Sequence, residues 1–400
     1  MLTRQGWLVG IGAAVLLVAG RILGVLELFA LGVVATALVV GSAILVHAAR
    51  LELEVGRVLH PSKVHVGTPS RVELSVRNLR AKRTPVLRLR DPVSGTRGAD
   101  LLVPPLGQGE HTVAAYRLPT DRRGLVQVGP LDVVVGDPFG LVQVATTGAP
   151  EVQLTVLPHV DEIPPLPYTS GRDPQAGLRQ LNALGRTGEE FYALRPYVIG
   201  DDHRRVHWPS SARLDELLVR QNELPWQGRT TVLLDVRAAA HEGESFEVAV
   251  SAAASVVTAT SRRQDLIRFL STGGFDSDFG PDSEHVAAIM EHLAVVRTDQ
   301  LGDLQRTLGL LNRRGSGGTL VAVVAGVAAE DLRSLLALRT RYGSVTVVHL
   351  DRSAWDPSAP VALPLDAGVL HVTRDAPFTD AWTTYVRAAA GGRARVASPR

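Results

Sequence analysis

The chain has 400 residues, which is too many for one ordinary domain and favours two or three domains. Its 42 Lys and Arg residues balance 40 Asp and Glu residues to a formal net charge of +2, so we expect no nucleic-acid partner, since such a partner requires a strongly basic surface. The sequence contains no cysteine, which excludes disulfides, thiolate zinc sites and thiol nucleophiles.

The first 49 residues predict two transmembrane helices, at about 6–26 and 28–49. The second is an almost unbroken apolar run whose only titratable residue is His47. At about 1.5 Å per residue, each segment is long enough to cross a hydrocarbon core of about 30 Å. The first contains Arg21, whose long side chain can extend to the membrane surface. A cleaved signal peptide is the alternative interpretation, but the second apolar run directly after the first favours a membrane anchor.

Basic residues flank the two predicted helices mainly on the side of their outer ends. Arg4 precedes the first helix, and Arg50, Arg57 and Lys63 follow the second, whereas the turn offers Arg21 alone. The positive-inside rule therefore predicts that both outer ends lie in the cytoplasm. We expect a two-pass protein of the inner or plasma membrane, with the lipid bilayer as a partner and the soluble domains in the cytoplasm.

Residues 50–157 alternate apolar and polar side chains with period two, as in Arg71–Arg77. This period is typical of strands with one buried face, and turn residues such as Asp91-Pro92 and Gly129-Pro130 separate the runs. Several short strands at this spacing predict an antiparallel β-sandwich of the immunoglobulin-like type. Further candidate strands are 86–90, 111–118, 125–128, 131–135 and 153–157.

Proline marks the predicted end of this domain. Ile163-Pro-Pro-Leu-Pro167 lies in a segment that we interpret as a Pro-rich linker over 158–187, because proline disfavours strand pairing and favours an extended chain. A docking ligand for an SH3-like groove is the alternative to a spacer. Residues 230–390 then alternate apolar strands with amphipathic helices, which predicts an α/β domain with a mostly parallel sheet covered on both faces. Residues 391–400 are predicted to form a basic tail.

Between the linker and the α/β domain, residues 188–229 hold a dense run of charged and aromatic side chains. Unpaired ions are costly to bury, so we predict that carboxylates and guanidinium groups pair here, above the aromatic rings of Phe191, Tyr197 and Trp208, and fix the junction between the domains. The predicted junction residues are Glu189, Glu190, Arg195, Asp201, Asp202, Arg204, Arg205, Trp208 and Arg213.

The order of these residues, G-x-x-F-x-x-L-R-x-Y-x-x-G-D-D-x-R-x-x-x-W-x-x-S-A-R from Gly188 to Arg213, resembles the family named domain of unknown function 58. Residues 123–131 and Asp137-Pro-Phe-Gly-Leu141 also resemble a segment of that family, so the resemblance covers roughly residues 50–240. The resemblance implies a von Willebrand A-like α/β domain. It also implies a partner, because related proteins are typically encoded beside MoxR-type AAA+ ATPases and are thought to act with them.

Asp235 ends the first predicted strand of the α/β domain, where a ligand is expected in an open α/β sheet. In von Willebrand A modules, an Asp-x-Ser-x-Ser motif at this place helps to hold Mg²⁺ with oxygen ligands. Here the sequence is Asp235-Val-Arg237-Ala-Ala239, so both hydroxyl positions are lost and one carries a guanidinium, which repels a cation. We predict a degenerate domain in which Arg237 pairs with Asp235 or with an acidic residue of the charged run. A metal site at Asp235 is the alternative.

Other chemistry-bearing patterns are incomplete. His203 and His207 have a spacing that zinc ligands use on a helix, but the surrounding sequence does not predict a long helix and supplies no general base. Ser210-Ser211 lacks the Gly-x-Ser-x-Gly context of a serine nucleophile, and Gly315–Gly318 lacks the Lys-Ser/Thr of a phosphate loop. We therefore predict no catalytic residue, no enzyme activity and no cofactor.

Together these features predict a non-catalytic, membrane-anchored scaffold or adaptor. The resemblance implies that it works with a MoxR-type AAA+ ATPase in protein-complex assembly or envelope maintenance. The alternative is a metal-dependent protein-binding module of the von Willebrand A type, and a metallohydrolase is a further alternative.

Overall fold

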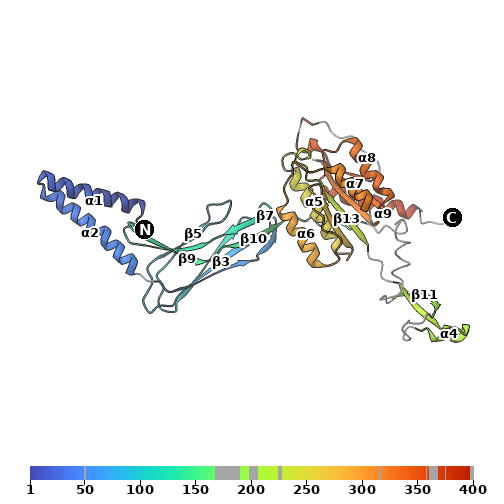
Figure 1. The fold of residues 1–400 in the computed structure, drawn as a ribbon, viewed down its shortest axis with the longest axis horizontal. Coiled ribbons are helices and arrows are strands. Elements are labelled where there is room, and N and C mark those ends of the chain that lie inside the picture. The colour runs from blue at the N-terminus through green and yellow to red at the C-terminus, as the bar shows by residue number, and fades with distance from the viewer. Residues whose placement is uncertain are drawn as a thin grey trace. The chain divides into compact units, whose positions relative to one another are not determined.

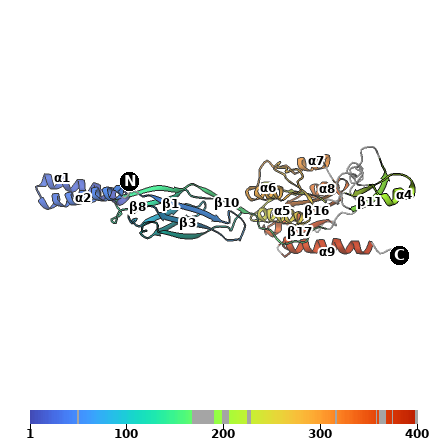
Figure 2. The ribbon, with the colours of Figure 1, turned by 90° about the horizontal axis from the view of Figure 1, so that it is seen from below.

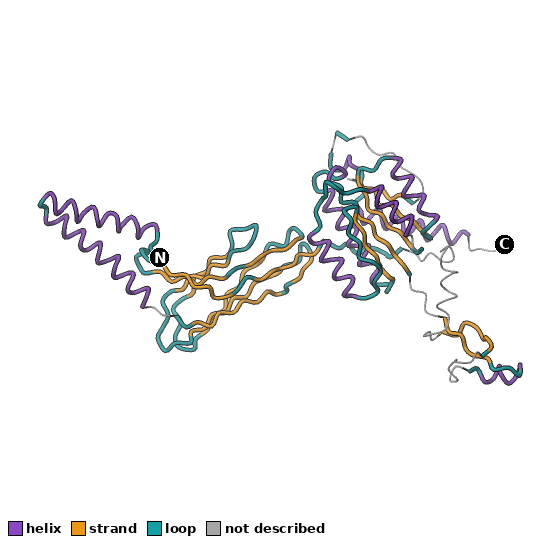
Figure 3. Tube along the Cα trace, viewed as in Figure 1, coloured by secondary structure: helices purple, strands orange, loops and turns teal. Residues whose placement is uncertain are grey.

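The protein consists of two compact units, Met1–Leu157 and Pro158–Arg400 (Figures 1 and 3). The first unit holds two helices and a β-sandwich, and the second holds a parallel sheet covered by helices. In this computed structural model, the described residues are 1–48, 51–166, 190–197, 206–223, 228–314, 317–356, 358–359, 368–373 and 375–396.

The first unit begins with an antiparallel helical hairpin of α1 (Arg4–Leu23) and α2 (Leu26–Ala48). Both helices are long and apolar enough to cross a membrane. The turn lies at Gly24 and Val25, because Gly24 adopts the left-handed conformation that ends a helix (φ +69°). Glu27 accordingly falls in the first turn of α2, where a carboxylate is favourable.

Alternating burial produces the predicted β-sandwich, with buried side chains at every second residue of β3 (Ser70–Asn78). One sheet has the order β1-β3-β6, a second has the order β5-β4-β8-β9, and a third has the order β2-β10-β7. Their inward side chains form one hydrophobic core. The other strands are β1 (Leu53–His60), β2 (Lys63–His65), β4 (Leu87–Asp91), β5 (Ala99–Val103), β6 (His111–Leu118), β7 (Gly124–Val128), β8 (Leu131–Gly136), β9 (Gln143–Ala149) and β10 (Val152–Leu157).

The sequence predicted a wholly antiparallel sandwich. In the structure one pair of strands differs, because β2 pairs with β10 in parallel. Only Pro61 and Ser62 separate β1 from β2, so the chain keeps its direction as it passes from one sheet to the next. The antiparallel interpretation was therefore wrong for this one pair of strands.

The sandwich also encloses a polar group that the sequence did not reveal. The Arg57 guanidinium donates through Nη1 to Asp91 Oδ1 at 2.6 Å, and the Tyr116 hydroxyl donates to Asp91 Oδ2 at 2.7 Å. The side chains of Arg57 and Asp91 are 1% and 0% exposed. Burial, together with the adjacent Asp91 carboxylate, raises the pKa of Tyr116 above its usual range, so the phenol stays a donor. Three strands, β1, β4 and β6, are thereby joined through one carboxylate.

In the second unit, five parallel strands form a sheet of order β14-β13-β15-β16-β17, which confirms the predicted parallel sheet. Helices cover both faces (Figure 2). On one face, α7 and α8 pack on Leu233, Leu320 and Val347, while on the other face α5 contacts the central strands and Tyr385 of α9 contacts Thr346 at 3.1 Å. The strands are β13 (Arg229–Leu234), β14 (Leu266–Ser271), β15 (Thr319–Ala325), β16 (Ser344–Leu350) and β17 (Val369–Val372). The helices are α5 (Ser245–Ser261), α6 (Ser283–Val295), α7 (Leu304–Arg314), α8 (Ala329–Ala337) and α9 (Phe378–Val396).

Residues 158–166, predicted as part of a spacer, instead pack on the α/β unit. The amide of Asp161 donates to Ser255 Oγ of α5 at 2.9 Å, and Trp382 of α9 donates through Nε1 to the carbonyl of Pro164 at 2.8 Å. Ile163 between them is 6% exposed. An extended proline-rich segment leaves its backbone polar groups unpaired, and side chains of the two helices supply an acceptor at Ser255 and a donor at Trp382. The remainder of the predicted linker, 167–187, lies outside the described residues.

Candidate functional site

The order of the parallel strands identifies the edge of the sheet at which a site is expected. From β13 the chain passes to β14 on one side, and then crosses β13 to continue at β15 on the other side. In open α/β sheets, ligands bind beyond the carboxyl ends of the strands where this change of direction occurs. Asp235 directly follows β13 at that point, Thr272 follows β14 and Gly326 follows β15.

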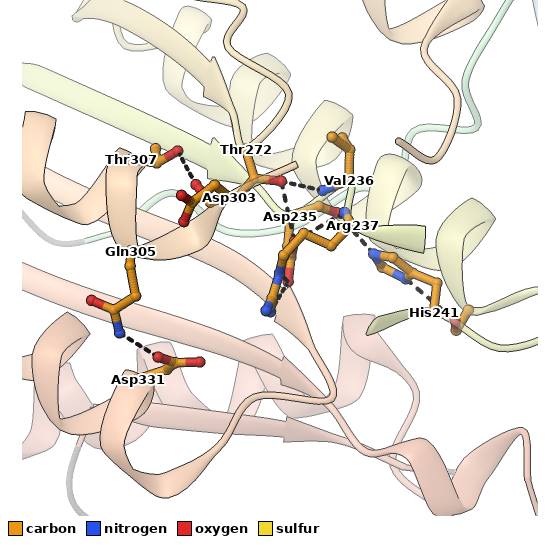
Figure 4. Close-up of polar contacts among 10 residues, drawn as sticks. Asp235, Val236, Arg237, His241, Thr272, Asp303, Gln305, Thr307 and Asp331 are labelled. Carbon is orange, nitrogen blue, oxygen red and sulfur yellow. Dashed lines mark hydrogen bonds and ion pairs between the residues drawn. The ribbon is translucent and has the colours of Figure 1, made fainter. Parts of the chain in front are cut away.

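Asp235 is fully buried there, and its carboxylate pairs with the guanidinium of Arg237 (Figure 4). Arg237 donates through Nε to Asp235 Oδ1 at 2.9 Å and through Nη2 to Oδ2 at 2.7 Å, so a planar guanidinium meets both carboxylate oxygens. The Arg237 amide adds a bond to Oδ1 at 3.1 Å, and the Thr272 hydroxyl adds one at 3.2 Å. Of the two pairings predicted for Arg237, the structure has the one with Asp235.

His241 and Thr272 fix the backbone around this ion pair. Thr272 Oγ1 accepts from the Val236 amide at 2.8 Å, and His241 Nε2 lies 2.8 Å from the Asp235 carbonyl. Burial holds the pKa of His241 below its usual value, although the nearby Asp235 opposes this effect. A neutral ring must donate from Nε2 to the carbonyl, so its Nδ1 accepts from Ser245 Oγ at 3.3 Å. These contacts orient Asp235 and the backbone that follows it.

The outer side of Arg237 meets an acidic and partly apolar loop. The Ala238 amide donates to the Asp299 carbonyl at 2.9 Å, and a side chain at Gly302 would contact Arg237 Cγ at 3.1 Å, so the loop packs directly on the guanidinium stem. The hydrogen bond to Asp235, together with the charges of Asp331 and Asp303, raises the pKa of Arg237. Leu301, at the tip of this loop, is 90% exposed.

The residues at this edge do not match a metal site of the von Willebrand A type. Both oxygens of Asp235 already bond to Arg237, and Arg237 and Ala239 stand at the positions that the expected Asp-x-Ser-x-Ser motif gives to its hydroxyl residues. Nor do any three His, Asp or Glu residues within the described ranges stand close enough to hold an ion. Asp303 caps α7 through the Arg306 amide at 3.0 Å, and Asp331 accepts from Gln305 (Figure 4). Each nearby carboxylate thus has a structural partner.

The charged run forms a separate two-stranded sheet of β11 (Glu190–Pro196) and β12 (Leu218–Glu223), with α4 (Trp208–Leu214) between them. Among the predicted junction residues, Glu190 and Arg195 lie on β11 and Arg213 lies exposed in the last turn of α4. Trp208 is 63% exposed, so the prediction that its ring packs beneath the cluster was wrong; as the first residue of a short helix, it projects from the surface. Glu189, Asp201, Asp202, Arg204 and Arg205 lie outside the described residues, as does His203.

His207 and the two serines after it organise α4. Ser210 Oγ lies 2.8 Å from His207 Nδ1, and Ser211 Oγ donates to the His207 carbonyl and accepts from the Leu218 amide at 2.9 Å. Ser211 is 7% exposed. These contacts stabilise the first turn of α4 and tie it to β12.

Sequence reasoning identified Asp235 and Arg237 but missed His241, Thr272 and the 299–303 loop around them. Only Thr272 carried a usable signal, since it follows the second parallel strand as Asp235 follows the first. The loop lies 62 residues or more beyond Arg237 in the chain, so no local pattern connects it to the ion pair.

Among solved structures, the CARDB domain of a Pyrococcus furiosus protein in complex with di-metal ions is 20% identical, covering 27% of this chain and 94% of that one, with a TM-score of 0.22. A β-glucosidase from Listeria innocua in complex with gluconolactone is 18% identical, covering 27% of this chain and 17% of that one, with a TM-score of 0.17. No match was found among curated proteins.

The model of one protein family, described as protein of unknown function DUF58, matches residues 193–365. This range begins in β11, includes α4 and the Asp235–Arg237 pair, and extends beyond β16. Residues 193–365 of this chain thus match the family described as protein of unknown function DUF58.

Proposed function

We propose that this protein is a membrane-anchored scaffold or adaptor without catalytic activity. Its proposed partner is a MoxR-type AAA+ ATPase, and its proposed process is protein-complex assembly or envelope maintenance. The observation that carries the proposal is the Asp235–Arg237 ion pair, in which a guanidinium bonds both carboxylate oxygens at the carboxyl edge of the sheet. We propose accordingly that the α/β unit is a degenerate module of that type, which binds proteins without a metal.

The surface around the ion pair has features of a protein-binding site. The Arg237 side chain remains 23% exposed, and its Nη1 atom forms no hydrogen bond with the described residues. Next to it stands Leu301, whose 90% exposure is unusual for a large apolar side chain. Arginine is enriched at protein interfaces, and an exposed large apolar side chain offers area that a partner can bury. We call Arg237 and the loop 299–303 the carboxyl-edge surface.

The two apolar helices, each long enough to cross a membrane, support an anchoring role. The hairpin turns at Gly24, so the outer ends of α1 and α2 lie on one side of a bilayer that it crosses, and both soluble units follow α2 on that side. With the basic residues at the outer ends, the positive-inside rule favours the cytoplasmic side of the inner or plasma membrane. A MoxR-type ATPase would be met in that compartment.

The replacement Leu301→Asp is expected to weaken binding of the full chain to the purified ATPase by about tenfold or more, since truncating a central apolar anchor costs roughly 2 kcal/mol. The dissociation constant is measured by biolayer interferometry, with the full chain held in nanodiscs. Leu102→Asp is the matched control, because Leu102 of β5 is also highly exposed (69%) but belongs to the sandwich. Equal affinities of the two variants would reject the carboxyl-edge surface as the docking site.

Metal analysis discriminates this proposal from a metal-dependent binding module, which is the alternative interpretation of Asp235. We expect purified full chain, equilibrated with Mg²⁺, Mn²⁺ or Zn²⁺ and then desalted, to retain far less than one equivalent of each by mass spectrometry. We expect ATPase binding to be unchanged by EDTA treatment of the adaptor before mixing. Stoichiometric metal that is lost in the Asp235→Ala variant would establish the metal-dependent alternative.

A further inference from the structure

One end of the β-sandwich is tied to the helical hairpin, and its loops are unlike those of the other end. The chain leaves α2 and enters β1 at Leu53, which pairs with Asn78 at the end of β3. His111 at the start of β6 pairs with Arg77 on the same side, and Gly136 and Gln143 flank the β8–β9 turn. The loops 79–86, 104–110 and 137–142 therefore meet at this end, which we call the hairpin end.

The loop 137–142, which contains the Asp-Pro-Phe-Gly-Leu motif, holds the start of α1. Thr3 donates through its amide to the Leu141 carbonyl at 2.9 Å and through Oγ1 to the Gly140 carbonyl at 2.6 Å. The amino group of Met1 and the carbonyl of Met1 both bond to Gln143. A side chain at Gly6 would collide with the Leu141 carbonyl, so helix and loop are in direct contact.

Asp137 gives this loop its shape. Its carboxylate accepts from the Val142 amide at 2.8 Å and from the Phe139 amide at 3.1 Å, and it is 8% exposed. Burial favours the neutral acid, but these amides and the Ser42 hydroxyl outweigh it and hold the pKa of Asp137 below its usual value. The loop is thus a defined structure in which Phe139 is 58% exposed.

The packing of the loop also fixes its depth relative to a bilayer. Leu141 and Val142 form an apolar cluster with Val46 and contact Val9 and Val39. Val39 lies about two and a half turns before the end of α2. Since α1 and α2 have 20 and 23 residues, each is about as long as the hydrocarbon core, about 30 Å. In a hairpin that spans a bilayer, this packing places the loop against the outer turns of both helices, in the headgroup region or just below it.

The neighbouring loop 79–86 carries Arg80, Lys82 and Arg83 and no acidic residue. Asn78, 1% exposed, organises it by donating to the Lys82 carbonyl at 2.9 Å and accepting from the Arg80 amide at 3.0 Å. The Leu79 amide bonds to the Glu52 carbonyl at 3.0 Å, four residues after the end of α2, so the loop starts next to the membrane span.

We propose that the hairpin end binds the surface of the bilayer in which the hairpin sits, with Arg80, Lys82 and Arg83 contacting anionic lipid headgroups and Phe139 entering the interface. The proposal rests on the proposed membrane anchoring. Juxtamembrane basic residues attract anionic lipid, and exposed aromatic side chains favour the interface, where Trp7 of α1, 61% exposed, also lies. The orientation of the sandwich relative to the bilayer is then fixed by its lipid contacts as well as by its covalent link to α2.

Acidic residues at this end do not cancel the basic loop. Glu52 and Glu54 are about two-thirds exposed and face Arg80 and Arg77 at 3.8 and 3.9 Å, which are weak surface contacts. Lys82 and Arg83 are exposed, and no described carboxylate lies within ion-pair distance of either. Carboxylates of the described residues therefore leave the charges of Lys82 and Arg83 without an ion pair, although Arg83 Nε donates to the Pro105 carbonyl at 3.4 Å.

Single-cysteine probes on the full chain test this surface, and the natural absence of cysteine makes each label unique. Ala81→Cys and Phe139→Cys report the hairpin end, and Arg97→Cys reports the far end, about 25–30 Å away along strands such as β3. Each variant carries a fluorophore in vesicles of phosphatidylcholine, with or without phosphatidylglycerol, containing lipid with a nitroxide headgroup. We expect quenching at 81 and 139 to exceed that at 97 about threefold or more, and phosphatidylglycerol to increase it at 81.

Charge reversal supplies the matched control. In the Ala81→Cys background, Lys82→Glu/Arg83→Glu is expected to remove the effect of phosphatidylglycerol, whereas Arg71→Glu/Arg117→Glu, the same change on exposed residues at the far end, is expected to leave it. If the chain stays in the vesicles, either of two results overturns the proposal: equal quenching at positions 81 and 97, or quenching at position 81 that does not change with phosphatidylglycerol content. Release of the chain by alkaline carbonate instead overturns the membrane anchoring itself.

Discussion

Replacement of Asp91 by alanine is expected to destabilise the β-sandwich by about 3–5 kcal/mol. The change leaves the Arg57 guanidinium, 1% exposed, without its carboxylate, and it removes the acceptor of the Tyr116 hydroxyl. An uncompensated buried charge costs far more than the pair contributes, because water can no longer solvate it. Hydrogen exchange of the β3 and β4 amides across a urea series measures this unit separately from the rest of the chain.

Two variants of the same sandwich make the result specific. Arg88→Ala breaks an ion pair with Asp100 of similar length, 2.9 Å, but both side chains are about half exposed, so we expect a loss of at most about 1 kcal/mol. Arg57→Met/Asp91→Leu removes both charges and is expected to recover much of the stability lost in Asp91→Ala. If Asp91→Ala and Arg88→Ala have equal effects, burial does not govern the contribution of the Arg57–Asp91 pair.

The second large effect is expected at the carboxyl edge of the parallel sheet. Arg237→Ala leaves Asp235, 0% exposed, with the Thr272 hydroxyl as its remaining side-chain donor, at a cost of about 3 kcal/mol, the low end of the range because Arg237 itself is partly exposed. Arg237→Lys is expected to recover only part of this loss, since an ammonium cannot bond both carboxylate oxygens in one plane. Hydrogen exchange of β13 and β15 is the measurement.

The control for this site lies on the same unit. Arg352 contacts Glu242 at 3.2 Å, but both side chains are about half exposed, so Arg352→Ala is expected to cost less than about 1 kcal/mol. If Arg237→Ala were as mild as Arg352→Ala and still bound the ATPase normally, Arg237 would be neither a structural counter-ion nor part of a docking surface. A stable Arg237→Ala variant that acquires stoichiometric metal would show that the guanidinium excludes a cation.

Local sequence patterns were sufficient where the physical signal repeats along the chain. Period-two alternation in Arg71–Arg77 predicted β3, and the apolar runs of residues 231–236 and 319–325 predicted strands buried on both faces. The pairing of Asp235 with Arg237 could also be predicted, as one of two pairings. Arg237 is only two residues away, and the sequence lacks the two hydroxyl residues of the expected motif.

Expectations failed where the partner of a group lies far along the chain. The 158–166 segment has the composition of a spacer, yet it packs on the α/β unit because Trp382, 218 residues after Pro164, supplies a donor to its carbonyl. Trp208 was expected to be buried because aromatic rings usually are, but α4 has only 7 residues and leaves it exposed.

The sequence by itself determined the order of the parts: two apolar helices, a β-sandwich and a parallel α/β sheet with a neutralised aspartate at its edge. Periodicity, helix length and charge are local properties, so the chain carries them without reference to its fold. Only the tertiary structure decided that Arg57 meets Asp91, that Thr3 meets the Asp137–Leu141 loop and that the 299–303 loop covers Arg237. Those contacts depend on strand register and packing across long sequence separations, which no local pattern encodes.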